Sequence, residues 1–164
     1  MRRAVKKLVV AAALRVVHAA LVELRTLDAA VADEFARLPV GTSYAIHTGH
    51  DCPSLYVEWD GERLRRPAQL EAPRCELRLK ALSVAFRMFT GQIGLAQGYA
   101  QHAFTMAGEV ADVMRLARLV NQAEAYLFPS FITRKFMSET PKRSASSLRL
   151  YGRLLIGFIT GRYK

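Results

Sequence analysis

Residues 81–119 read ALSVAFRMFTGQIGLAQGYAQHAFTMAGEVADVMRLARL, and this stretch decides the fold. Leu82, Phe86 and Phe89 lie at helical spacing, so they predict one face of a helix. The Thr-Gly pair at 90–91 ends that helix, because glycine adopts the left-handed conformation at little cost. The stretch therefore opens with a short helix that stops at a glycine turn.

Beyond this turn the spacing of the apolar residues changes. Residues 96–101 are long enough for a short helix only, whereas 102–108 alternate with a period of two, which predicts a strand. Glu109 opens the next helix, where an acidic side chain is favoured by the positive end of the helix dipole. We expect the apolar face of this helix to consist of Val110, Val113, Met114 and Ala117. We expect its polar face to consist of Asp112, Arg115, Arg118 and Gln122.

Three earlier segments also alternate between apolar and polar residues. These are 43–48, 54–60 and 74–80, and the second is followed by an Asp-Gly turn and a short return strand over 62–66. A helix over 28–38, capped by its first residue, precedes them. We expect the first three strands to be antiparallel and to join 102–108 in one sheet that helices cover on one face.

The order of these elements resembles the sterol carrier protein type two family of lipid-binding domains. That order is a helix, Thr-Gly, a short helix ending in an aromatic residue and Gln, an alternating strand, Gly and an amphipathic helix. The matching positions, over roughly 28–120, are Thr90, Gly91, Tyr99, Gln101, Phe104, Met106, Gly108, Met114 and Leu116. The chain departs from the family pattern at Gln92, Leu95, His102, Ala103, Thr105 and Ala107.

The resemblance implies an α+β, sterol-carrier-like fold: a mainly antiparallel sheet of about four to five strands, with helices that enclose an apolar cavity. Periodicity alone would assign the apolar side chains to an ordinary core. With the resemblance, we expect a lipid-binding tunnel lined by Phe86, Phe89, Ile93, Tyr99, Phe104, Met106, Val110, Val113, Met114 and Ala117. The family binds sterols, fatty acyl groups and other apolar molecules, and one branch assists ubiquinone synthesis by holding the polyprenyl intermediate.

The two ends of the chain carry its positive charge, which is +10 overall. Residues 1–7 contain four basic and no acidic side chains, and residues 134–164 contain eight basic and one acidic. Residues 8–133 contain twelve basic and thirteen acidic side chains, so the middle is nearly neutral. Because bulky apolar residues are interleaved with the terminal charges, nucleic acid is not expected as a partner.

This distribution predicts three parts: an N-terminal basic and apolar helix over 1–27, a lipid-binding domain over 28–128, and a basic and apolar extension over 129–164. A mobile linker is expected over 138–147. The ends either pack on the domain, within the molecule or across a homodimer, or they bind an anionic membrane surface. Arg15 and His18 interrupt the N-terminal apolar run, which is too short for a membrane span.

No phosphate loop, dinucleotide fingerprint or serine-nucleophile elbow is present in the sequence. Possible zinc ligands cluster at His47, His50, Asp51 and Cys52, with Cys75 on a predicted strand, but a polar hairpin turn explains them better. We therefore expect no enzyme activity, no cofactor and no metal. The two cysteines make no disulfide framework, which favours a cytoplasmic protein, in part peripheral to a membrane.

Two functions thus follow from the sequence. The first is non-catalytic binding or carrying of a sterol, fatty acyl or polyprenyl type of ligand at a membrane surface. The alternative is an interaction or accessory protein with a filled core that docks on a partner subunit, such as a ubiquinone-synthesis accessory factor.

Overall fold

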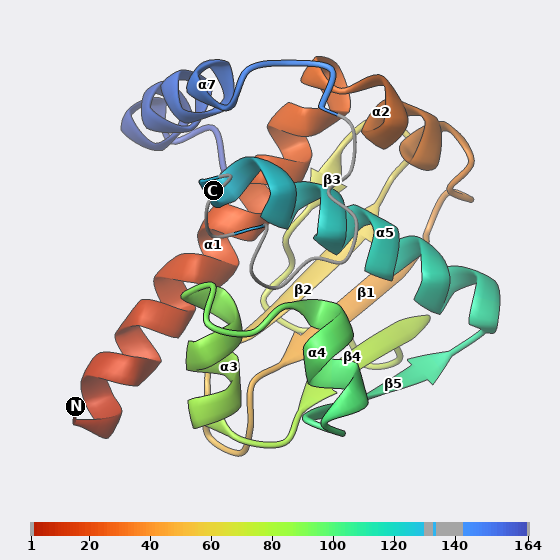
Figure 1. Cartoon of the computed structure of the whole chain (residues 1–164). Helices are drawn as coiled ribbons and strands as arrows, with labels where there is room; N and C mark the ends of the chain where they lie inside the picture. Colours follow the sequence, from red (N-terminus) through yellow and green to blue (C-terminus); the bar gives the residue numbers. More distant parts are fainter. Residues whose placement is uncertain (1, 130–132, 134–142, 164) are drawn as a thin grey trace.

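The computed structural model describes residues 2–129, 133 and 143–163 (Figure 1). The helices are α1 (Arg3–Leu27), α2 (Ala29–Ala36), α3 (Leu82–Phe89), α4 (Leu95–Ala100), α5 (Val110–Leu127) and α7 (Ser147–Thr160). The strands are β1 (Ser43–His47), β2 (Ser54–Trp59), β3 (Leu64–Arg65), β4 (Cys75–Leu79) and β5 (Phe104–Gly108). The fold is α+β, as the sequence predicts. The first half of the expected linker over 138–147, residues 138–142, lies outside the described residues, and from Ser147 the chain is helical.

The strands form one open sheet in the order β3-β2-β1-β4-β5. β1 is antiparallel to β2 but parallel to β4, so the prediction that the first three long strands are all antiparallel is wrong. The cause lies in the strand between them: β2 is antiparallel to both β1 and β3, so β3 runs in the same direction as β1. Residues 66–74 then return along the sheet, so that β4 starts at the same end as β1, as a parallel pair requires.

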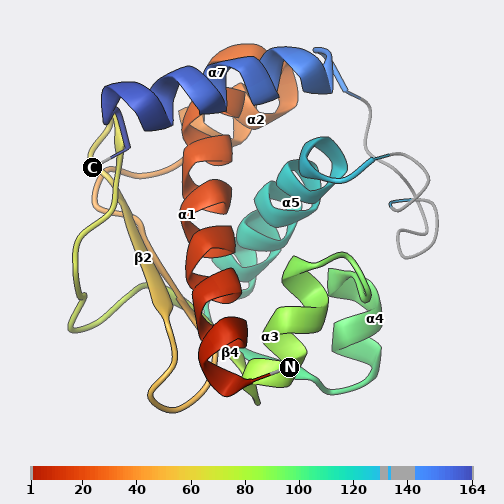
Figure 2. The ribbon, with the colours of Figure 1, turned by 90° about the vertical axis from the view of Figure 1, so that its left-hand side faces the viewer.

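Helices α1, α3 and α5 lie on one side of this sheet (Figure 2). On β2, Leu55, Val57 and Trp59 are buried beneath them, whereas Tyr56 and Glu58 on the other face are only half-buried. The alternation in the sequence therefore predicts the covered face of this strand correctly.

The last strand begins later than predicted, at Phe104 instead of residue 102. His102 is exposed and has a φ of 50°, and this left-handed conformation closes the turn after α4 and is incompatible with a regular strand. The other end of β5 is as expected. Gly108 has a φ of 131°, and an added Cβ would lie 2.6 Å from the carbonyl oxygen of Arg74. Only glycine fits this close approach to β4.

Helix α5 presents a different face to the core than the sequence predicts. Val110 and Met114, assigned to the apolar face, are 78% and 51% exposed. Asp112 and Gln122, assigned to the polar face, are buried. The buried apolar side chains of this helix are Leu116, Leu119, Ala123, Ala125 and Tyr126.

Specific partners allow the two polar side chains of α5 to be buried. The Arg74 Nε donates to Asp112 Oδ2 at 2.5 Å, and the Gln122 Nε2 donates to Asp28 Oδ2 at 3.1 Å. A hydrogen-bonded polar group loses little on burial, so these partners outweigh the preference of Asp and Gln for solvent.

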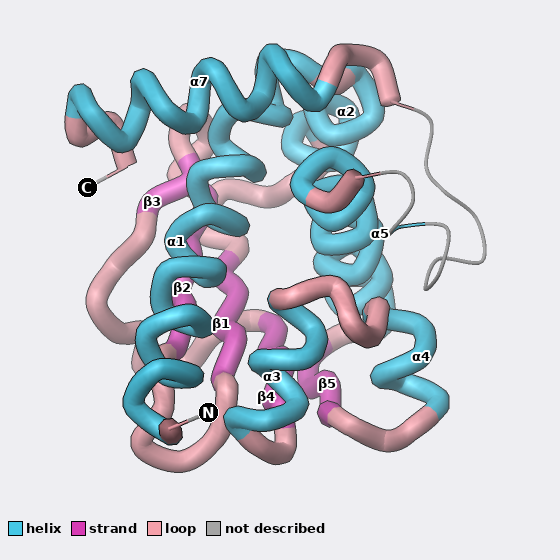
Figure 3. The backbone as a smooth tube through the Cα atoms, turned by 60° about the vertical axis from the view of Figure 1, so that its left-hand side comes forward, coloured by secondary structure: helices cyan, strands magenta, loops and turns pink. Residues whose placement is uncertain are grey.

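The two ends of the chain pack together. α7 lies across the C-terminal half of α1 (Figures 1 and 3), and its own side chains Leu150 and Leu154 are buried in this contact. α1 in turn buries Leu14 and Leu24 against the rest of the molecule. The sequence leaves open whether the ends pack on the protein, and their inner faces do.

A buried carboxylate joins α7 to α1. Glu23, which is 3% exposed, accepts hydrogen bonds from Arg153 Nη1 at 3.3 Å, from Arg162 Nη1 at 3.0 Å and from the Tyr163 hydroxyl at 2.9 Å. These bonds hold the C-terminal end of α7 in place.

Two glycines of α7 should respond oppositely to substitution by alanine. A Cβ at Gly157 would overlap the ring and hydroxyl of Tyr163, whereas a Cβ at Gly152 meets nothing within 4 Å. We expect Gly152→Ala to stabilise the protein by about 0.5–1 kcal/mol, because alanine favours helix. Gly157→Ala should destabilise it by about 1–3 kcal/mol, because Tyr163 must leave Glu23. Urea unfolding of both variants tests this packing, and an equal gain from both would contradict it.

Candidate functional site

An apolar pocket of about 470 Å³ lies between α1, the sheet, α3, α5 and α7. On α1 and the sheet it is lined by Ala13, Val16, Val17, Ile46, Leu77 and Leu79. On α3, α4, α5 and the residue after α5 it is lined by Met88, Phe89, Leu95, Val120, Ala123, Glu124, Leu127 and Phe128. On α7 it is lined by Tyr151, Leu154, Leu155 and Phe158. Nearly all these side chains are hydrocarbon, so the pocket suits an apolar ligand.

The pocket has two polar side chains among the described residues that line it. The hydroxyl of Tyr151 donates to the backbone carbonyl of Leu127 at 2.8 Å and so is already engaged. Glu124 is half-buried as a residue, but its Oε2 atom is shielded from solvent and has no hydrogen-bond partner in the described part of the chain. The pKa of Glu124 is raised to about 8 by burial, and the opposing effect of a backbone hydrogen bond from Leu95 is smaller. The carboxyl group is therefore mostly protonated at neutral pH.

Of the ten side chains predicted to bind lipid, Phe89 lines this pocket. Ile93 and Phe104 are buried in the core, at 1% and 4% exposure. The partly buried members of the set, which pack against the core, are Phe86, Met106, Val113 and Ala117. The exposed members are Tyr99, Val110 and Met114.

The predicted set therefore does not come together around one pocket. α5 is oriented so that Val110 and Met114 face solvent. The Phe104 ring packs against Gly98, where an added Cβ would lie 3.0 Å from the ring atom Cε1. An enclosed tunnel at Phe104 and Met106 stays a prediction.

Much of the pocket wall comes from the two ends of the chain, which the family resemblance does not cover. The signal for them was present in the sequence as two apolar runs, over 8–22 and 148–159. Each run needs another surface to cover it. Sequence alone could not show that both contribute to one pocket.

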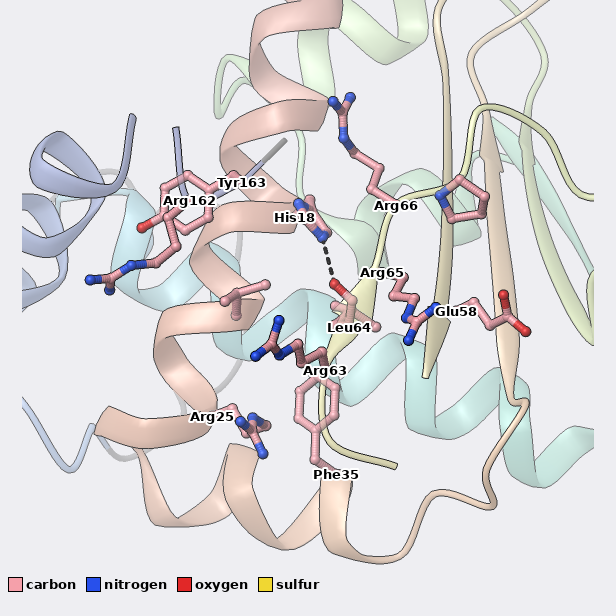
Figure 4. A pocket seen from close by; sticks show the side chains of 12 residues that line it. His18, Arg25, Phe35, Glu58, Arg63, Leu64, Arg65, Arg66, Arg162 and Tyr163 are labelled. Atoms are coloured by element: carbon pink, nitrogen blue, oxygen red, sulfur yellow. Dashed lines mark hydrogen bonds between the residues drawn. The ribbon is translucent and has the colours of Figure 1, made fainter. Parts of the chain in front are cut away.

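A second pocket, of about 860 Å³, lies on the other side of α1 and is rich in arginine (Figure 4). His18 and Arg25 project from α1 toward the segment that carries Arg63 and Leu64 (Figure 4). The His18 Nε2 lies 3.0 Å from the carbonyl oxygen of Leu64, and burial lowers the pKa of this imidazole. The arginines that line the pocket are Arg25, Arg63, Arg65, Arg66 and Arg162.

Only some of these arginines have acidic partners. Arg65 pairs with Asp60 at 2.6 Å, and Arg162 pairs with Glu23 at 3.0 Å. Within the described part of the chain, Arg63 and Arg66 form no ion pair. Glu58 also lines the pocket, but the arginines outnumber the acidic side chains, so the described part of the pocket keeps an excess of positive charge, which attracts anions.

The structure does not gather the possible zinc ligands. His50 pairs with Asp51 at 2.9 Å, and the Cys52 thiol lies 3.2 Å from the His50 carbonyl, as in a polar turn. Cys75 pairs with Tyr44 at the start of β1, at the opposite end of that strand from the turn. Among the described residues, no three His, Cys, Asp or Glu side chains form a group that could hold a metal ion.

Comparison with known proteins gives likenesses of structure only. No protein-family model and no curated protein matches the chain. A solved structure described as "UbiJ-SCP2 Ubiquinone synthesis protein" is 16% identical, with a TM-score of 0.45 over 62% of this chain and 90% of the other. Sterol carrier protein 2 like 2 from Aedes aegypti is 11% identical, with a TM-score of 0.37 over 51% and 79% of the two chains. This chain is thus similar in structure to proteins that carry the name of sterol carrier protein type two, the family that its sequence resembles.

Proposed function

We propose that the protein binds an apolar, lipid-like molecule in the pocket between α1, α5 and α7, without chemical change to it. The observation that carries this proposal is the pocket itself, whose volume of about 470 Å³ lies in the usual range for small-molecule sites. Burial of hydrocarbon contributes roughly 25 cal/mol per Å², less the cost of association. Met88 and the flexible leucines of the wall can adapt to ligands of different shape.

We further propose that the outer face of α7 holds the protein on an anionic membrane surface. Four bulky side chains on this helix are more than half exposed: Leu148, Leu155, Ile156 and Ile159. The exposed Arg149 flanks them, and the arginine-rich pocket adds positive charge at the C-terminal end of the helix. None of the helices in the described part of the chain is long and apolar enough to cross a membrane.

Two neighbouring alanines of α1 test the pocket directly. Ala13 lines the pocket, whereas Ala12 is exposed on the same helix. We expect Ala13→Phe to fill part of the pocket and to weaken binding of a fluorescent fatty acid analogue at least about tenfold. Ala12→Phe should leave the affinity unchanged, which controls for the added ring. Equal affinities in a fluorescence titration of the two variants would contradict the proposed site.

One observation also favours the alternative, an accessory protein that docks on a partner subunit or on a second copy of itself. The exposed face of α7 has the composition of an interaction surface as well as that of a membrane-binding helix. If the wild-type protein binds no apolar probe and sediments with no vesicles, but forms a dimer or captures a subunit through α7, this alternative replaces the proposal.

A further inference from the structure

Glu124 is an ionisable side chain in a pocket whose other described wall residues are almost all hydrocarbon. The wall residues from α1, the sheet, α3 and α4 that line the pocket carry no titratable side chain, and α7 contributes only Tyr151. The Tyr151 hydroxyl bonds to the backbone carbonyls of Tyr126 and Leu127 and is not directed to Glu124 by any bond in the described part of the chain. No charged group among the described residues of the wall therefore neutralises Glu124.

The unpaired atom of Glu124 is the informative one. Its Oε2 is shielded from solvent and has no partner among the described residues, and a buried polar atom without a partner is unfavourable. A ligand oxygen in the pocket would give this atom a partner. A protonated carboxyl group can donate its O–H to a hydroxyl or carbonyl oxygen, and its other oxygen can accept a hydrogen bond.

We infer that Glu124 recognises the polar end of the ligand, which is an uncharged hydroxyl or carbonyl oxygen on a long apolar molecule. This inference rests on the proposed function and names its ligand class. A fatty alcohol or long-chain ketone fits this pocket better than a plain hydrocarbon, because the hydrocarbon leaves the Oε2 atom of Glu124 without a partner. It also fits better than a fatty acid anion, because the described residues of the wall include no cation to pair with a carboxylate.

The test measures how dodecanol, dodecane and dodecanoate displace diphenylhexatriene, a fluorescent hydrocarbon that needs only the apolar wall. In the wild type we expect dodecanol to bind about fivefold more tightly than dodecane or dodecanoate, the effect of one hydrogen bond. Glu124→Leu should still bind diphenylhexatriene but should lose the preference for dodecanol. Glu124→Gln should keep most of that preference, because an amide also donates and accepts a hydrogen bond.

Proton dependence gives a second readout that does not need the leucine variant to fold. In the wild type the affinity for dodecanone should fall as the pH rises past about 8, because a ketone oxygen only accepts a hydrogen bond and the carboxyl group then loses the proton that it donates. In Glu124→Gln it should stay constant over the same range. Circular dichroism shows whether each variant is folded at each pH.

The outcomes separate the inference from the proposal on which it rests. If diphenylhexatriene does not bind the wild type, both are overturned. If it binds the wild type but dodecanol and dodecane compete equally, or if Glu124→Leu keeps the preference for the alcohol, only the role of Glu124 is overturned.

Discussion

Asp28→Ala should lower the melting temperature by roughly 10 °C, which corresponds to about 3–5 kcal/mol of stability in a chain of this length. Asp28 is 1% exposed and joins three parts of the molecule. Its carboxylate caps α2, and it also accepts hydrogen bonds from α5 and from the segment before α7. The donors are the backbone amides of Ala30, Val31 and Ser144, the Gln122 side chain and the Tyr126 hydroxyl. Alanine would remove the acceptor that these donors share.

The stabilisation that Asp28 provides should also depend on pH. Burial alone would raise the pKa of Asp28, but hydrogen bonds from Tyr126, Ser144, Val31 and Gln122 outweigh it, so the pKa lies below the ordinary value of 3.8. A lowered pKa means that the stabilisation is present above pH 3.8 and is lost as the pH falls through the lower, folded value.

Asp33 on the same helix provides the control for Asp28. It pairs with Arg37 at 2.9 Å, but both side chains are more than two-thirds exposed, and such surface pairs contribute little. Asp33→Ala should therefore change stability by less than about 1 kcal/mol. Thermal unfolding by circular dichroism measures both variants, and similar melting temperatures for the two would show that Asp28 is not a structural centre.

The double variant Ile156→Glu, Ile159→Glu should lose most of its binding to vesicles that contain anionic lipid, by more than about tenfold. These isoleucines are 57% and 76% exposed on α7, and each is worth roughly 1.5–3 kcal/mol when it leaves water. The acids also repel the anionic surface. Binding of the wild type should weaken with salt, since charges are screened over about 10 Å at 0.1 M. Co-sedimentation with vesicles measures both effects.

A matched double variant on α5 controls for the two added charges. Val110 and Met114 are similarly exposed, so Val110→Glu, Met114→Glu carries the same change at a place outside α7. It should keep most of the vesicle binding. Equal losses in the two double variants would mean that net charge alone holds the protein on the membrane and that α7 has no special part.

The local structure was largely predictable from the sequence because its signals are local. The Thr-Gly turn, the alternating strands and the cap at Asp28 depend on residues a few positions apart. The short return strand at 62–66 is also present, as β3.

The errors arose where a distant partner decides the outcome. Asp112 is buried because Arg74, from the loop before β4, reaches it, and Gln122 is buried because Asp28 does. Neither partner can be assigned from the pattern of α5 alone, so the sequence predicts an apolar face of which Val113 and Ala117 pack against the core but Val110 and Met114 are exposed. The parallel pairing of β1 and β4 likewise depends on the path of residues 66–74.

The candidate site was the least predictable part. The residues chosen from the resemblance lie mostly in the middle of the chain, whereas the apolar pocket is built by placing α1 and α7 against α5. The role of Glu124 could not be foreseen, because an acid in an amphipathic helix normally faces solvent.

Photoaffinity labelling tests the central claim, that an apolar ligand occupies the pocket between α1, α5 and α7. A fatty alcohol with a diazirine in the middle of its chain would be bound to the wild-type protein and irradiated, and the labelled peptides identified by mass spectrometry. We predict labels within 13–17, 120–128 and 151–158 that unlabelled alcohol suppresses. Suppressible labels confined to Phe104 and Met106, or no suppressible label anywhere, would contradict the account.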